Sequence, residues 1–591
     1  MSHPHEHGHT HPHSHEHDDH AHSHGAHEHP HSHDHTHGDE PLRPALDLGV
    51  PDSELPPAEL GRRNFLRAAG VLGAGVAATS FVGAGGLATA AATEASDAGS
   101  RRGHRAKSWL AGDHHIHTQF SSDGLYRVAD HVQHANAYGL DWMVITDHGS
   151  AQHVKIGVEQ VNPEIVAARG DFPDMLVFQG LEWNIPAAEH GTVFVHPGSG
   201  EVSVLKAFEA GYDGVVKSAT ASNAANEQLA LQGLTFLQSA VGSRQVKDAL
   251  MLANHPARKG IDSPHEIRAW RDAAPGIAIG MEGAPGHQAA GLPTPLGPGS
   301  GRGYYDNAPS SDSFAAYPPE SYRTFGGFDW MTATVGGLWD SLLSEGKPWW
   351  ITANSDSHSI YLDTAVRGPG DDFAANGKHA DPINGPVPVT SNGDYWPGYY
   401  SRTHVGVGRR SYAAVMEGLR QGSVWVDHGR LVDELDVTVR SGGDGASLGG
   451  ALVVRRGSRA RVSIRIKPAH LPNWAQFIPQ LKKVDAIVGS VTGPAADKDT
   501  FAAPQTRVVK SWDVTGAVGR DGWIELSLDL GPIGDQGVYV RLRGSDGKRL
   551  AAGVKGASVD PAGPAIDEIG KANPWDDLWF YTNPIWVLPR R

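Results

Sequence analysis

Six short apolar runs between Ser108 and His358 each end in a histidine or an acidic residue, and this repeated ending restricts the fold most. The residues at these ends are His115, His117, Asp147, His148, Glu182, His255, Glu282, Asp356 and His358. Stretches with helical spacing of apolar residues, such as 127–139 and 337–346, separate the runs. Alternating strands and helices predict a parallel sheet, and a closed α/β barrel brings the carboxyl ends of its strands to one face. We therefore expect an α/β fold in which these side chains meet in one pocket.

The side chains at the run ends are metal ligands by type. A buried charge without a partner is costly, and coordination of a metal ion offsets that cost. The chain has no cysteine, and imidazole and carboxylate donors without sulfur favour Zn²⁺, Mn²⁺ or Fe²⁺. The candidate ligands outnumber the coordination sites of a single tetrahedral or octahedral ion, so we expect two or three divalent metal ions.

The order of the motifs resembles that of the PHP (polymerase and histidinol phosphatase) superfamily of metal-dependent phosphoesterases. The motifs are H-x-H with SSDG, GLDWMVITDH, GLE, NHP and NSDSH, and they fall within residues 109–430. The resemblance implies a distorted (β/α)7 TIM-like barrel with a site for two or three metal ions. Carried over residue by residue, it implies the metal ligands His115, His117, Asp123, His148, Glu182, His190, His255, Asp356 and His358.

Some assignments within this ligand set stay open in the sequence. His190 and His196 both follow Glu182, and His190 fits the spacing of the family better. Asp123 stands at a position where family members have either histidine or aspartate. His114 is expected to face away from its neighbours, because alternate residues of a strand point to opposite sides.

We predict supporting roles for two residues outside the ligand set, Asp147 and Arg258. Asp147, like Asp113, is expected to orient imidazole rings, with a strand-end cap as the alternative for Asp147. Arg258 and Lys259 follow the NHP motif and are candidates to bind a substrate phosphate, or else are solvated loop charges.

Two long segments rich in Gly, Pro, Asp and Tyr flank the predicted mouth of the pocket. They cover about 283–328 and 359–400, and long loops in compact domains are usually functional or disordered. We expect them to shape the substrate cleft. His287 in the first segment, and His265 before it, are unassigned candidates for proton transfer, with a structural role as the alternative for each.

The first 95 residues differ in composition from the rest of the chain. Residues 1–60 are a histidine-rich tail that is expected to be disordered and to bind metal ions, with a passive tail as the alternative. Residues 61–95 resemble a Tat-type signal, because Arg62 and Arg63 precede a mild apolar run that ends in small residues. The run is too rich in Gly and Ala to be a permanent membrane span. The resemblance implies export by the Tat machinery to the periplasm, cell wall or extracellular space.

Two domains are predicted after the signal. Residues 104–430 form the metal-binding barrel, and short alternating strands separated by Gly, Asp and Pro predict a β-sandwich over 432–591. The sandwich is expected to serve as a scaffold, with surface or carbohydrate binding as the alternative. The net charge of −16 argues against a stable nucleic-acid partner, because phosphate contacts need an excess of Lys and Arg.

The sequence as a whole predicts an exported metal-dependent phosphoesterase. Its substrate would be a small-molecule phosphomonoester or phosphodiester, with a metal-activated hydroxide as nucleophile. One alternative is a carboxylic or carbamate ester hydrolase with the same metal site, since the chain also resembles secreted carbaryl-hydrolase-type members of the superfamily. The other is a metal-binding protein without catalytic activity.

Overall fold

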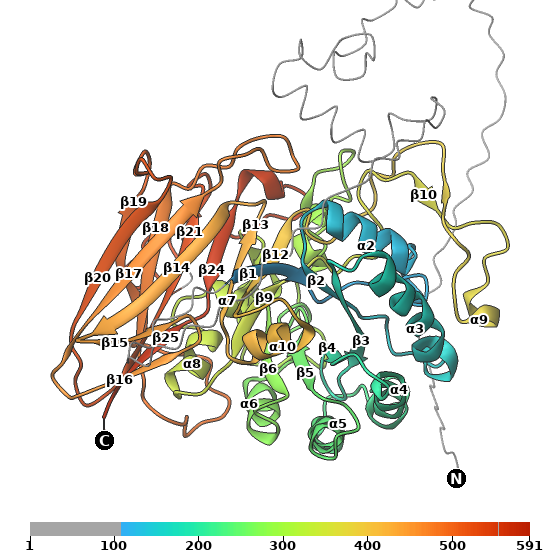
Figure 1. The fold of residues 1–591 in the computed structure, drawn as a ribbon, viewed down its shortest axis with the longest axis horizontal. Helices are drawn as coiled ribbons and strands as arrows, with labels where there is room; N and C mark the ends of the chain where they lie inside the picture. The colour runs from blue at the N-terminus through green and yellow to red at the C-terminus, as the bar shows by residue number, and fades with distance from the viewer. Residues whose placement is uncertain (1–107, 554, 591) are drawn as a thin grey trace, which may run out of the picture. The chain divides into compact units, whose positions relative to one another are not determined.

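The computed structural model describes residues 108–553 and 555–590, which belong to one compact unit, Arg102–Arg591. The predicted histidine-rich tail and Tat-type signal lie outside the described residues. Figure 1 shows helices and strands mixed in the first part of this unit, and strands predominating in its last part.

Seven strands of the first part form one continuous ladder in the order β1-β2-β3-β4-β5-β6-β9. Their bounds are β1 (Ser108–Asp113), β2 (Trp142–Ile145), β3 (Leu176–Asn184), β4 (His190–Val195), β5 (Ala249–Ala253), β6 (Ala278–Ala284) and β9 (Trp350–Ala353). β2, β5 and β9 are buried along their whole length, as expected for apolar strands covered on both faces. The predicted apolar runs are therefore strands of one mixed α/β sheet.

The directions of the strands depart from the all-parallel prediction at one place. β1, β2 and β3 are parallel, and so are β5, β6 and β9, but β4 is antiparallel to both of its neighbours. β3 and β4 are joined by a short loop, 185–189, which suffices for a hairpin but not for a crossover to a parallel strand. The start of β4 therefore lies beside the carboxyl ends of the other strands.

The two ends of this ladder approach each other through the backbone. Ile116 and Ser357 form an isolated parallel bridge, and the amide of His117 donates to the carbonyl oxygen of Ser357 over 3.0 Å. Ile116 lies just beyond β1 and Ser357 just beyond β9, so the polar segments that follow these two strands are in contact.

Helices follow most of the strands and contact one another in chain order, with α2 to α6 along one side of the ladder (Figure 1). The helices are α2 (Val128–Ala137), α3 (His153–Asp171), α4 (Glu201–Tyr212), α5 (Ala224–Gly242), α6 (Pro264–Ala273), α7 (Trp330–Ala333), α8 (Leu338–Ser344), α9 (Phe373–Asn376) and α10 (Tyr412–Arg420). The predictions over 127–139 and 337–346 correspond to α2 and α8. α6 begins with a capping box, in which Ser263 and Glu266 exchange side-chain and backbone hydrogen bonds.

The predicted insertions contain only short elements. The first holds β7 (Thr324–Phe325), β8 (Phe328–Asp329) and the 3-10 turns η2 (Gln288–Gly291), η3 (Arg302–Tyr304) and η4 (Pro319–Tyr322). The second holds β10 (Ala365–Val366), α9 and β11 (Ile383–Asn384), at the edge of the view in Figure 1. Among the described residues, no helix has the length and apolarity needed to cross a membrane.

The C-terminal part is built from two sheets of largely antiparallel strands. One sheet has the order β15-β14-β17-β20, and the other continues the main ladder through β12, β13, β24, β21 and β25. The strands are β12 (Ser401–Val407), β13 (Val424–His428), β14 (Val432–Ser441), β15 (Asp444–Ser447), β16 (Ala451–Val454), β17 (Arg459–Pro468), β18 (Lys483–Ser490), β19 (Arg507–Asp513), β20 (Ile524–Pro532), β21 (Val538–Ser545), β22 (Leu550–Ala551), β23 (Gly563–Pro564), β24 (Trp579–Thr582) and β25 (Ile585–Pro589). β14 and β17 alternate buried and exposed residues, and their buried side chains share one apolar core with the second sheet.

Candidate metal centre

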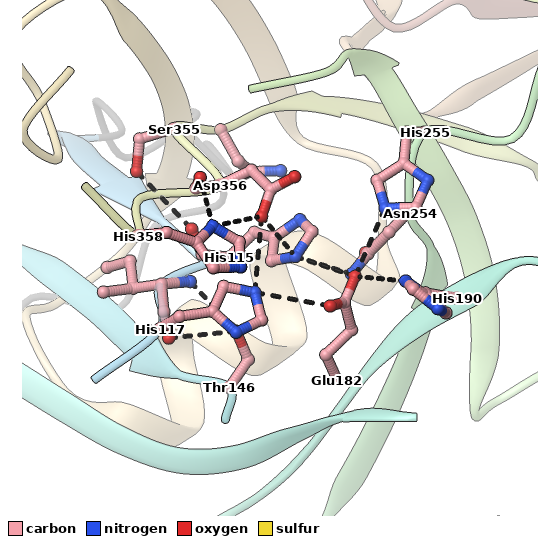
Figure 2. Close-up of polar contacts among 12 residues, drawn as sticks. His115, His117, Thr146, Glu182, His190, Asn254, His255, Ser355, Asp356 and His358 are labelled. Atoms are coloured by element: carbon pink, nitrogen blue, oxygen red, sulfur yellow. Dashed lines mark hydrogen bonds and ion pairs between the residues drawn. The ribbon is translucent and has the colours of Figure 1, made fainter. Parts of the chain in front are cut away.

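The predicted ligands gather where strands of the ladder end. His115 and His117 follow β1, His255 follows β5, and Asp356 and His358 follow β9. Glu182 lies in β3 and forms a bridge with His148, and His190 opens β4. Because β4 is antiparallel, its first residue lies at the same edge as the ends of its neighbours. Figure 2 shows the imidazoles and carboxylates of the labelled ligands pointing toward one another: His115, His117, Glu182, His190, His255, Asp356 and His358.

Glu182 lies at the centre of the cluster, with a side-chain exposure of only 1%. Its Oε1 is 2.8 Å from His115 Nε2, 3.2 Å from His190 Nδ1 and 3.3 Å from His255 Nε2. Its Oε2 is 3.0 Å from His148 Nε2 and 3.3 Å from His117 Nε2. The two carboxylate oxygens therefore face different histidines, as is expected of a carboxylate shared between two metal ions.

The donor atoms fall into overlapping groups whose members lie within 4.8 Å of one another. Five such groups are His117 with Asp123, His148 and His358; His115 with Glu182 and His255; His115 with His117 and Asp356; His148 with Glu182 and His190; and Glu189 with His190 and His255. The first four groups contain all nine ligands that the resemblance implies. They fit a centre for more than one ion, because several donors belong to two groups.

Several donor atoms of this cluster are buried without a hydrogen-bond partner among the described residues. They are His117 Nε2, His190 Nδ1, His255 Nδ1 and Asp356 Oδ1. Such atoms are rare in folded proteins and call for an ion, a water or a ligand. The donor set, without sulfur, suits Zn²⁺, Mn²⁺ or Fe²⁺. The residues present thus fit the divalent metal ions that the sequence predicts.

The electrostatics of the cluster keep its carboxylates ionised. Burial alone would raise the pKa of Glu182, but the charges of His115 and His148 hold that pKa well below its usual range. Burial lowers the pKa of His190 to about 4. In contrast, neighbouring carboxylates outweigh burial and raise the pKa of His358 to about 9 and that of His115 well above its usual range. Metal ions bind neutral imidazoles and ionised carboxylates, so metal binding would release the protons that these carboxylates favour on the imidazoles.

Three residues of the site have a left-handed backbone, which is unusual without glycine. The φ angles are 30° at His255, 47° at Asp356 and 51° at His287. Such strained residues persist where the surrounding structure enforces them, and they cluster at functional sites.

Glu282 and Asn254 support the cluster, although neither is among the predicted ligands. Glu282 Oε1 lies 2.8 Å from His115 Nδ1, and its Oε2 accepts the backbone N–H of His255 over 2.8 Å. Asn254 donates to Glu182 Oε1 over 3.0 Å. With Nδ1 bonded to Glu282, His115 presents Nε2 to the other donors. The sequence signals were the position of Glu282 at a strand end and that of Asn254 in the NHP motif.

Asp147 and Asp113 bind the backbone rather than imidazole rings. Asp147 accepts from the amide of Thr118 over 2.6 Å and from its hydroxyl. Asp113 accepts from the amides of His115 and Ser355 over 3.0 and 2.9 Å. Within the described part of the chain, neither carboxylate hydrogen-bonds a ring nitrogen. Both carboxylates therefore hold the backbone next to predicted ligands, and the roles predicted for Asp147 and Asp113 stay predictions.

Hydrogen bonds place the side chains of His114 and His196 outside the cluster. His114 faces away from the cluster, because its ring nitrogens lie 3.1 Å from Thr192 Oγ1 and 2.8 Å from Thr352 Oγ1. His196 Nδ1 bonds the carbonyl of Pro197, outside the cluster, so His190 is the histidine that joins Glu182.

A cavity of about 420 Å³ opens onto the cluster. Its lining residues are Asp123, His148, Glu182, His190, His255, Arg258, His287, Tyr304, Asp356, His358, Ser359 and 391–394. The two insertions contribute His287, Tyr304 and 391–394, so they do shape the cleft. No motif in the sequence pointed to Tyr304 or Asp394. His265 does not line the cavity, and its Nδ1 pairs with Asp499.

Arg258 lies in the wall of this cavity. Its Nη2 lies 3.0 Å from Glu189 Oε2, and Lys259 Nζ lies 3.2 Å from Glu189 Oε1. Glu189 is buried, and its ion pair with Arg258 keeps the guanidinium at the cavity wall. Lys259 does not line the cavity.

Comparison with known proteins gives a match over part of the chain. Residues 113–249 match the family model of the PHP domain. The chain is similar to the crystal structure of a two-domain protein containing a predicted PHP-like metal-dependent phosphoesterase from Bacteroides vulgatus, with 15% identity, a TM-score of 0.30, and coverage of 75% of this chain and 95% of that one. No curated protein sequence matches this chain. The segment that matches the PHP domain contains the first six predicted ligands, His115 to His190, and the other three lie beyond it.

Proposed function

We propose that this protein is a metal-dependent phosphoesterase with two or three divalent ions, Zn, Mn or Fe, in the cavity. The observation that supports it best is the position of Glu182, whose two oxygens face five histidines at the ends of four strands, β1, β2, β4 and β5. The match to the PHP domain supports the same activity. In this proposal the ladder from β1 to β9 is the distorted (β/α)7 barrel, and the C-terminal strands form the β-sandwich.

The four overlapping donor groups of the cluster, from His115 to His358, would hold the ions. Bound divalent ions would supply Lewis-acid stabilisation of phosphoryl oxygens. They would also lower the pKa of bound water, so that it ionises near neutral pH. The side chains of the protein position the ions and the substrate. Glu282 fixes the ring of His115, and Arg258 offers a guanidinium to phosphoryl oxygens that enter the cavity.

The substrate in this proposal is a small molecule, a phosphomonoester or a phosphodiester. The volume of about 420 Å³ is in the range of small-molecule sites. Most of its lining is polar or charged, which suits a charged substrate.

We also propose that the protein is exported by the Tat machinery to the periplasm, cell wall or extracellular space. The support is the twin-arginine pattern of residues 61–95. N-terminal sequencing of the secreted protein should find a start between about residues 88 and 104. Unprocessed protein confined to the cytoplasm, or export that does not need Arg62 and Arg63, would contradict this.

The activity is tested with p-nitrophenyl phosphate, bis-p-nitrophenyl phosphate and p-nitrophenyl acetate, on metal-free protein reloaded with Zn²⁺, Mn²⁺ or Fe²⁺. We expect hydrolysis of a phosphate ester that requires metal and is lost in His115→Ala. His265→Ala, outside the cavity, serves as the matched control and should retain activity. Hydrolysis of the acetate alone would support the carboxylic ester alternative instead. Activity that survives both complete chelation and His115→Ala would refute the metal mechanism.

A further inference from the structure

We propose that His287, held by Asp394, is a positioning residue that fixes Asp356 for metal binding. The inference rests on the proposed function, since it concerns a side chain of the proposed metal centre. His287 and Asp394 come from the two different insertions, and neither belongs to the ligand set that the sequence predicts.

The two oxygens of Asp356 face different surroundings. Oδ1 points into the histidine cluster, 3.1 Å from His115 Nε2 and 3.3 Å from His117 Nε2. Oδ2 points the other way and lies 2.7 Å from His287 Nε2. The contact with His287 therefore occupies one oxygen and leaves the other directed toward the position of an ion.

Asp394 fixes the ring of His287 from its other side. Asp394 Oδ1 lies 2.5 Å from His287 Nδ1. Its Oδ2 accepts the amides of His358 over 2.7 Å and of Ser359 over 2.8 Å. Asp394 thus links the amide of the predicted ligand His358 to the ring of His287, and His287 in turn contacts Asp356.

Backbone packing holds the two loops in place. The amide of His287 donates to the carbonyl of Ser355 over 3.2 Å, directly before Asp356. A Cβ at Gly286 would collide with the carbonyl of Ser355 and with the Cβ of Asp356, so only glycine permits this approach. The amide of Ala289 donates to the carbonyl of Gly393, which joins the first insertion to the second.

These contacts restrict the carboxylate of Asp356 to one orientation. Residues that orient a metal ligand through a hydrogen bond commonly contribute a factor of about 10–100 in metal affinity. His287 has 11% side-chain exposure and Asp394 3%, so both contacts are largely shielded from water. Loss of His287 should therefore weaken the binding of the ion that Asp356 holds.

The test measures metal affinity, not only activity, in the full chain. Dissociation constants for Mn²⁺ and Zn²⁺ are obtained by competition with a chelator for the wild type, His287→Ala, His287→Gln and Asp394→Asn. We expect His287→Ala to raise the dissociation constant of one ion by about 10–100-fold. His287→Gln retains an N–H donor and should restore most of the affinity, and Asp394→Asn should show a smaller loss than His287→Ala.

The matched control is His404→Ala. His404 is also a buried imidazole paired with a carboxylate, because its Nε2 lies 2.9 Å from Asp427 Oδ1, but it does not line the cavity. Its loss should lower the stability of the protein and leave metal affinity unchanged. This separates an effect on positioning from a general loss of stability.

An affinity of His287→Ala within about twofold of the wild type would overturn the inference and leave the proposed function standing. Equal weakness of His287→Gln and His287→Ala would overturn it in favour of His287 as a direct ligand. If His287→Ala does not fold, Asp394→Asn decides, and unchanged affinity there overturns the inference. A wild-type protein that binds no divalent ion would instead reject the proposed function.

Discussion

At the scale of single residues, the central feature is the shared carboxylate of Glu182. Five imidazole nitrogens lie within 3.3 Å of its two oxygens, so it contacts five of the six predicted histidine ligands. Its ionised form is favoured by those histidines despite burial. Replacement by a neutral side chain of the same shape separates the role of its charge from the role of its volume.

We expect Glu182→Gln to reduce metal affinity by more than about 100-fold, since even outer residues of metal sites contribute about 10–100-fold. Phosphate ester hydrolysis should fall with metal content. Metal analysis and the chelator competition check this. The variant should fold, because the amide can still bond the surrounding imidazoles. Full metal content in this variant would show that Glu182 is not a ligand.

Arg258 gives a second prediction at this scale. Arg258→Ala should raise KM for a phosphate ester by about 10–100-fold, because a hydrogen bond to a charged group contributes about 1.5–3 kcal/mol. Lys259→Ala is the matched control, since Lys259 also contacts Glu189 but does not line the cavity. Steady-state kinetics of both variants provide the measurement, and equal effects of the two would exclude a specific role for Arg258.

At the scale of elements, the antiparallel strands β12 and β13 join the α/β part to the C-terminal sheets. Arg402 in β12 lies directly opposite Asp427 in β13, and the two side chains form a buried ion pair at 2.8 Å. His404 bonds the same carboxylate. Burial would raise the pKa of Asp427, but the charge of Arg402 and the bond from His404 hold it well below its usual range.

Because the folded-state pKa of Asp427 is depressed, its stabilising contribution is present above its ordinary pKa of about 4 and is lost as the pH falls below it. Asp427→Asn should lower the free energy of unfolding by about 3–5 kcal/mol at pH 7. That difference should shrink by about 1 kcal/mol at pH 3. Urea unfolding at both pH values measures it.

The control for this prediction is Asp535→Asn. Asp535 pairs with Arg456, but both side chains are about 70% exposed. Asp535→Asn should therefore lower the free energy of unfolding only slightly at either pH. A pH-independent difference between wild type and Asp427→Asn would contradict the prediction.

At the scale of the whole molecule, buried ion pairs connect the α/β part with the C-terminal sheets. Asp340 in α8 accepts two hydrogen bonds from Arg541 in β21, over 2.8 and 2.7 Å, and both side chains are buried. β24 pairs with β13 in the same ladder. The two parts therefore share both backbone and side-chain contacts.

We expect the described part of the protein to unfold as one cooperative unit. Hydrogen exchange measured by mass spectrometry should give the same opening free energy for α8 and for β21. Asp340→Asn should lower both by about 3–5 kcal/mol, because it leaves Arg541 buried without its charged partner. Loss of protection in only one of the two elements would show that the parts unfold separately.

Much of the fold was predictable because its signals are local. Buried strands such as β2 and β5 are continuous apolar runs, and α2 and α8 have helical periodicity and glycine at their ends. The direction of β4 was missed. Periodicity identifies a strand but not its direction, which depends here on the short loop 185–189.

The candidate site divides in the same way. The sequence by itself determined the kinds of donor and their places at strand ends, since residue type and strand pattern are local properties. Only the tertiary structure decided which donors face one another, that Asp147 accepts the amide of Thr118, and that His287 meets Asp394, 107 positions away. These contacts depend on the paths of two long insertions, and no periodic pattern of residues encodes such paths.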